Sequence, residues 1–145
     1  MYFSRKISIF LILVLLCILT IPGCQRFVNN RSEYIDPYSK NLSESIKEAL
    51  LKNKKLVLSV GTGLCENCKI VENTLLEFKK EKPDNLEVII FSDYTDTNTF
   101  QALGVSVSPT TLLIDENHKV VRRIIGPFTV NELKSYLKVI DWEKY

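Results

Sequence analysis

Metal-binding and cross-linking residues are scarce in this sequence. It has one histidine, His118, and four cysteines among 145 residues. A structural zinc site takes four ligands. His118 stands in "DENHK", where we expect a solvated hairpin turn, so the four ligands of a zinc site would have to come from two chains. Disulfide-stapled proteins carry several widely spaced cysteine pairs, which this sequence lacks. The composition therefore argues against a metal site and excludes a small disulfide scaffold.

Long apolar runs are also lacking, apart from one near the start of the chain. Fifteen uncharged residues, 7–21, follow Arg5 and Lys6, which is the layout of a secretory signal. At about 1.5 Å per residue, this run is shorter than a hydrocarbon core of about 30 Å. We therefore expect a cleaved signal, and a retained signal anchor is the alternative.

The run ends in "TIPGC" at residues 20–24, where Gly23 precedes Cys24 and Ile21 stands three residues before it. This segment resembles the lipobox of bacterial lipoproteins. The resemblance implies a signal peptide at residues 1–23 and attachment of diacylglycerol to the Cys24 sulfur. An ordinary cysteine beyond a retained anchor is the alternative. Both readings place the rest of the chain outside the cytoplasm, anchored to the bacterial cell membrane.

Neither sign of charge is in excess in the expected mature chain. The whole chain has 19 basic and 17 acidic residues, and the loss of Arg5 and Lys6 with the signal leaves 17 of each. The excess of positive charge therefore belongs to the targeting segment. It gives no reason to expect nucleic acid as a partner.

The segment behind Cys24 differs from the rest of the mature chain. Residues 24–38 are mostly polar, lack a sustained period and include Pro37. We interpret them as a lipid-anchored tether, although part of the segment could form a short edge strand. Residues 39–145 would then form the folded domain.

Helical and strand patterns alternate through this domain. Helices are expected within 41–55 and at 65–78, 95–103 and 129–140, and strands at 56–60, 86–91, 110–115 and 119–125. Asn41 is the candidate N-cap of the first helix, and Thr129 with Glu132 forms a capping box for the last. The order predicts an α/β fold, with a mixed sheet of four to five strands and helices on both faces.

Two cysteines stand where a strand, a glycine loop and a helix meet. "LVLSV" leads through "GTG" to Cys65, which opens a helix, and Cys68 follows one turn later. The N–H groups and dipole of a helix start favour thiolate over thiol, and Lys69 adds a nearby cation. One sulfur could attack a substrate disulfide while the other resolves the mixed disulfide. The expected apolar stripe of this helix comprises Ile70, Val71, Thr74, Leu75 and Phe78.

The chain from about 41 to 140 resembles the thioredoxin superfamily. The resemblance rests on "CENCK" at 65–69, "GVSVSPTTLLID" at 104–115 and Gly126. It implies a thioredoxin-like three-layer sandwich with Cys65 and Cys68 as the catalytic pair. It also implies that Pro109 is cis and faces the disulfide across a groove, with the backbone of Ser108 offered to a substrate chain.

Three positions depart from the pattern of the family. Leu64 replaces the usual aromatic residue, Ser59 the buried acid, and Glu66-Asn67 the Gly-Pro dipeptide. Without the buried acid, water or Glu66 would have to take the proton of the resolving thiol. The charge of Glu66 should oppose a thiolate at Cys65, which favours a reductant over a strong oxidant.

The sequence thus predicts a membrane-tethered thiol–disulfide oxidoreductase that acts on protein thiols and disulfides. It would need no cofactor beyond its own dithiol, and a membrane electron donor would recharge it. The alternative is a thioredoxin-fold binding or chaperone module whose cysteines are regulatory or not catalytic. The loss of the aromatic residue and of the buried acid favours this alternative slightly.

Overall fold

Five strands form one mixed sheet in the order β1-β5-β4-β2-β3. The computed structural model describes residues 33–142, so the expected signal peptide, Cys24 and the first part of the expected tether lie outside the described residues. The elements are β1 (Glu33–Tyr34), α2 (Glu44–Leu51), β2 (Lys55–Val60), α3 (Glu66–Phe78), β3 (Leu86–Phe91), α4 (Thr97–Ala102), β4 (Thr110–Ile114), β5 (Lys119–Ile125) and α5 (Val130–Val139). β2 is parallel to β3 and antiparallel to β4, and β5 is antiparallel to both β4 and β1.

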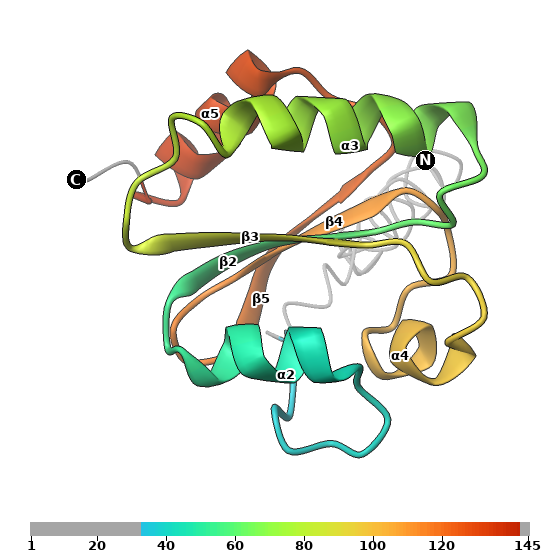
Figure 1. Ribbon diagram of the computed structural model, residues 1–145. Coiled ribbons are helices and arrows are strands. Elements are labelled where there is room, and N and C mark those ends of the chain that lie inside the picture. Colours follow the sequence, from blue (N-terminus) through green and yellow to red (C-terminus); the bar gives the residue numbers. More distant parts are fainter. Residues whose placement is uncertain (1–32, 143–145) are drawn as a thin grey trace, which may run out of the picture. The chain divides into compact units, whose positions relative to one another are not determined.

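The sheet lies between two layers of helices, with α3 and α5 on one face and α2 and α4 on the other (Figure 1). The mixed sheet and the helices on both faces agree with the predicted thioredoxin-like α/β fold. Within residues 33–142, no helix combines the length and the apolar character needed to cross a bilayer.

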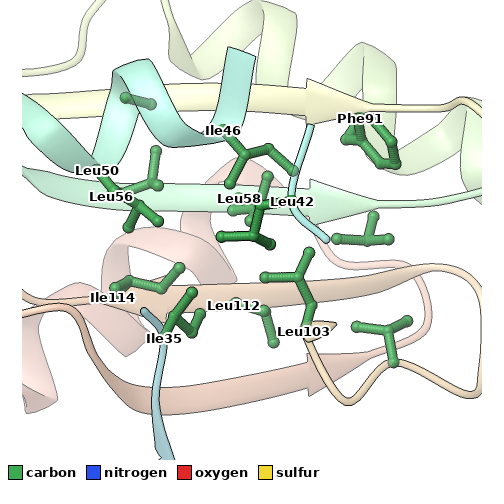
Figure 2. Packing of buried hydrophobic residues seen from close by; sticks show 13 residues of the cluster. Ile35, Leu42, Ile46, Leu50, Leu56, Leu58, Phe91, Leu103, Leu112 and Ile114 are labelled. Carbon is green, nitrogen blue, oxygen red and sulfur yellow. The ribbon is translucent and has the colours of Figure 1, made fainter. Parts of the chain in front are cut away.

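Two apolar cores, one on each face, hold these layers together. Every residue of β2 after Lys55 is buried, as expected for a central strand covered on both sides. Because successive side chains point to opposite faces, Leu56 and Leu58 pack with α2, and Val57 packs with α3 and α5. Figure 2 shows the first core, which includes Ile46, Leu58, Leu112 and other residues of the cluster.

The N-terminal strand was one of two possibilities that the sequence left open. Glu33 and Tyr34 pair with β5, and the next residue, Ile35, is buried in the first core. Arg123 of β5 binds the carboxylate of Glu33 and donates to the carbonyl oxygen of Leu103 at 2.8 Å. Part of the segment interpreted as a tether is therefore built into the sheet.

Two helix starts show which cap predictions were right. The capping box of Thr129 and Glu132 is present at the start of α5, as predicted. The Asn41 cap was wrong, because α2 begins at Glu44 and Ser43 occupies the N-cap position. The buried Thr99 of α4 explains this difference, since its hydroxyl accepts from the N–H of Ser43 and donates to the carbonyl of Asn41.

Candidate active site

Cys65 and Cys68 form a disulfide at the start of α3. The bond joins Sγ atoms 2.08 Å apart, and the two Cα atoms are 5.2 Å apart. Cys65 is the N-cap residue of α3, and its sulfur accepts a hydrogen bond from the N–H of Cys68 at 3.1 Å. The predicted position of Cys65 at a helix start is confirmed. This N–H and the positive end of the helix dipole stabilise negative charge on the Cys65 sulfur.

The two sulfurs differ in their access to solvent. Cys65 is half-buried, whereas Cys68 is only 6% exposed and belongs to the buried face of α3. The expected apolar stripe is therefore shifted, because Cys68 is buried and Ile70 is 44% exposed. Cys65 therefore presents the more accessible sulfur of the pair, and the Cys68 sulfur is buried.

Pro109 lies beside the disulfide. The Ser108–Pro109 peptide bond is cis, as the resemblance implied. Pro109 is buried and lines the same small cavity as Cys68, while Ser108 is half-buried. The carbonyl of Pro109 accepts from the N–H of Gly126 at 3.0 Å, and the hydroxyl of Thr110 donates to the carbonyl of Val107 at 2.6 Å. These two bonds fix the loop that carries Ser108 and Pro109.

The loop between β2 and α3 packs against the side chain of Cys68. The N–H of Gly61 donates to the carbonyl of Phe91 at 2.9 Å, which holds Gly61 at the end of the sheet. A Cβ at Gly61 would lie 3.3 Å from the Cys68 sulfur, so a glycine allows this close approach. The hydroxyl of Thr62 lies 3.9 Å from the same sulfur.

The small cavity adjoining Cys68 has a volume of about 10 Å³. Its wall includes Ser59, Cys68, Ile90, Pro109 and Glu72. Ser59 is buried and uncharged, so the departure predicted at this position places no carboxylate there. Sequence reasoning missed Glu72, although its spacing of four residues from Cys68 places both on one face of a helix.

Lys69 and Glu66 are the side chains that the sequence predicted to support the cysteine pair. Lys69 and Glu66 lie exposed in the first turn of α3, and neither lines the cavity of Cys68. Glu66, one of the two proton acceptors that the sequence left open for the resolving thiol, is thus exposed to solvent outside that cavity. Leu64, immediately before Cys65, is 75% exposed and presents an apolar side chain beside the disulfide.

His118 lies in the hairpin turn between β4 and β5. Its ring Nε2 lies 3.1 Å from the carbonyl oxygen of Leu50, which links the β4–β5 turn to the end of α2. Among residues 33–142, no group of three histidine, cysteine, aspartate or glutamate side chains is placed to hold a metal ion.

No protein-family model and no curated protein sequence matches this chain. Similar solved structures are thioredoxins. Thioredoxin O2 from Arabidopsis thaliana in the oxidised state is 22% identical with a TM-score of 0.55, and the match covers 66% of this chain and 86% of that one. Desulfothioredoxin from Desulfovibrio vulgaris Hildenborough is 21% identical with a TM-score of 0.52, covering 59% and 81%. A chloroplastic thioredoxin z is 14% identical with a TM-score of 0.60, covering 69% and 90%. The chain therefore has the thioredoxin fold, as its sequence predicted.

Proposed function

We propose that this protein is a thiol–disulfide oxidoreductase that acts outside the cytoplasm, tethered to the membrane, and reduces or exchanges disulfides in protein substrates. One observation carries the proposal. The Cys65–Cys68 disulfide caps α3 beside cis-Pro109, with one sulfur partly accessible and the other buried. A pair of thiols that differ in access is what a two-step exchange requires.

The reaction follows from this difference in access. In the reduced protein, the Cys65 thiolate attacks one sulfur of a substrate disulfide, forms a mixed disulfide and releases one substrate thiolate. Cys68 then loses its proton and attacks the Cys65 sulfur, which forms the Cys65–Cys68 disulfide and releases the second substrate thiolate. Two electrons pass from the dithiol to the substrate. No cofactor takes part in these steps.

The surface beside the disulfide suits an extended protein chain. Ser108 and Pro109 would form the groove, with the backbone of Ser108 free to pair with the substrate. Leu64 and Val107 are 75% and 51% exposed, respectively, and each directly precedes a residue of the site. Apolar side chains at these two places favour protein substrates over small hydrophilic thiols.

A trapping experiment tests the exchange mechanism. Cys68→Ala should accumulate mixed disulfides with its substrates, because no thiol remains to resolve them. Cys65→Ala is the matched control and should trap nothing, because Cys68 is buried. If neither variant traps a substrate and the native protein fails to reduce insulin disulfides, the protein is a binding module rather than an oxidoreductase.

Glu66 supports the reducing direction of the proposal. Its negative charge adjoins Cys65, so it should make the thiolate form less favourable and the disulfide form relatively more stable. Equilibration with glutathione should then give a potential nearer the thioredoxin value of about −270 mV than the strong-oxidant value of about −120 mV. A value near the oxidant end would refute the reducing direction and the need for a membrane electron donor.

The tether is tested separately, at Cys24. Labelling of the expressed full chain with radioactive palmitate should mark the wild type, whereas Cys24→Ala should remain unlabelled. A mature protein that begins before residue 24 and carries no label would instead support the retained signal anchor.

A further inference from the structure

An acidic residue that the steps described so far do not use lines the cavity adjoining Cys68. Glu72 lies four residues after Cys68 on α3, and both residues line this cavity. On a helix, side chains at this spacing are neighbours, with Cβ atoms about 5–6 Å apart. Glu72 is half-buried, whereas Glu66 and Lys69 of the same helix are exposed.

We infer that Glu72 is the proton acceptor for the Cys68 thiol during resolution of the mixed disulfide. The inference rests on the proposed exchange function. When Cys68 attacks, its S–H proton passes to the Glu72 carboxylate, so that Cys68–SH and Glu72–COO⁻ become Cys68–S⁻ and Glu72–COOH. The thiolate forms a bond to the Cys65 sulfur, the bond from Cys65 to the substrate breaks, and the substrate leaves as a thiolate. Glu72 then returns its proton to the departing thiolate or to solvent.

The need for such an acceptor follows from the burial of Cys68. A thiol that is 6% exposed has little contact with bulk water, and an apolar surrounding favours the neutral thiol over the thiolate. The cavity volume of about 10 Å³ lies at the lower limit of the space for one water molecule. Among the described residues, Glu72 is the acidic residue that lines this cavity together with Cys68, so it is the group placed to take the proton.

Among the described residues that line the cavity, no other titratable group competes for this role. The strand β2 contributes Ser59, the loop after it contributes glycines, and the end of β3 contributes apolar residues and Ser92. Pro109 also lines the cavity. Asp93, the residue after Ser92, is exposed, and its carboxylate accepts bonds from Thr95. The Glu72 carboxylate has no hydrogen bond or ion pair to any residue in the described range 33–142, so it is free to accept the proton.

Rapid mixing of the reduced protein with one equivalent of 5,5′-dithiobis(2-nitrobenzoate) separates the two chemical steps. The first nitrothiobenzoate is released by attack of Cys65, at a rate that depends on reagent concentration. The second nitrothiobenzoate is released by attack of Cys68 on the mixed disulfide, at a rate that is independent of reagent concentration. Glu72→Gln should leave the first rate within about twofold of the wild type and slow the second at least tenfold at pH 7, since general bases typically contribute about 100-fold or more.

The pH profile distinguishes proton transfer from a merely structural role. The second rate should be nearly independent of pH between pH 6 and 8 in the wild type, because Glu72 takes the proton of Cys68 as the new bond forms. In Glu72→Gln it should rise about tenfold per pH unit from pH 6 to 8, because Cys68 must then ionise without a local acceptor. Glu72→Asp keeps a carboxylate and should recover part of the rate. Glu77→Gln removes an exposed charge from the same helix and should match the wild type.

Three results would overturn the inference. The first is a second rate in Glu72→Gln equal to that of the wild type and of Glu77→Gln. The second is an equal slowing of both phases, which would place the effect of Glu72 on Cys65 or on the fold. The third is the release of no nitrothiobenzoate by the wild type, which would refute the proposed function itself and the inference with it.

Discussion

Substitution of Gly61 by alanine should make the Cys65–Cys68 disulfide easier to reduce. The added Cβ would stand 3.3 Å from the Cys68 sulfur and 3.5 Å from its Cβ. Gly61 is not among the glycines with positive φ, so alanine fits the backbone there. The hydrogen bond of Gly61 to Phe91 holds the backbone in place, and the contact must therefore be relieved by Cys68.

The magnitude of this effect depends on how freely the Cys68 sulfur can move. In the disulfide the sulfur is held by a closed ring, so yielding by a few tenths of an ångström strains its side-chain torsions, at about 0.5–1.5 kcal/mol. In the dithiol the sulfur can turn away at little cost. The reduction potential should rise by about 10–30 mV, since 30 mV corresponds to about 1.4 kcal/mol for two electrons. Loss of glycine freedom in the unfolded chain affects both redox forms equally, so it cancels in the potential.

The potential is measured by equilibration with glutathione, acid quenching and alkylation of the free thiols. Urea unfolding of the oxidised and reduced forms provides an independent control, because the difference between their two changes in unfolding free energy must equal the shift in potential. A reduction potential that is unchanged or more negative in Gly61→Ala would refute the argument that a Cβ at this position strains the Cys68 side chain in the disulfide.

Two further predictions concern stability. Ile46→Ala should lower the free energy of unfolding in urea by about 2–5 kcal/mol, because Ile46 is fully buried against the sheet. Leu51→Ala on the same helix alters a residue that is 45% exposed, so it should change the free energy of unfolding far less. Backbone and side-chain hydrogen bonds from Thr129 lower the pKa of Glu132 from its usual value of 4.5. The stabilisation by this carboxylate is therefore present above about pH 4.5 and is lost as pH falls through the lowered pKa. When the free energy of unfolding is measured against pH, Glu132→Gln should show a smaller decrease on the acid side than the wild type.

The two cap predictions show which contacts a sequence pattern can reveal. The capping box joins Thr129 to Glu132, three residues away, so every partner lies inside the pattern itself. The start of α2 depends instead on Thr99, 56 residues from Ser43. A local pattern has no information about that contact, and the candidate at Asn41 failed for this reason.

The sheet was predicted well where strands are buried on both faces, and less well at its edge. The apolar run of β2 specifies a central strand without reference to its neighbours. The two-residue strand β1 has no such run, and it is fixed by pairing with β5 and by the contact between Glu33 and Arg123. Only the partner strand distinguishes such a segment from a tether.

The cavity adjoining Cys68 depends both on contacts between distant segments and on local spacing along a helix. It is lined by the end of β2 and the loop after it, the first turns of α3, the end of β3 and Pro109, and only the folded sheet brings these segments together. The position of Glu72, however, is predictable from the sequence. The apolar residues alone indicate a helical face that includes Ile70, whereas the positions three and four residues after Cys68 are Val71 and Glu72. On α3 the buried Cys68 is itself a reference for the buried face. Under the exchange mechanism proposed above, a carboxylate one turn after this cysteine is where a proton acceptor should be sought, because the strand beneath supplies only Ser59.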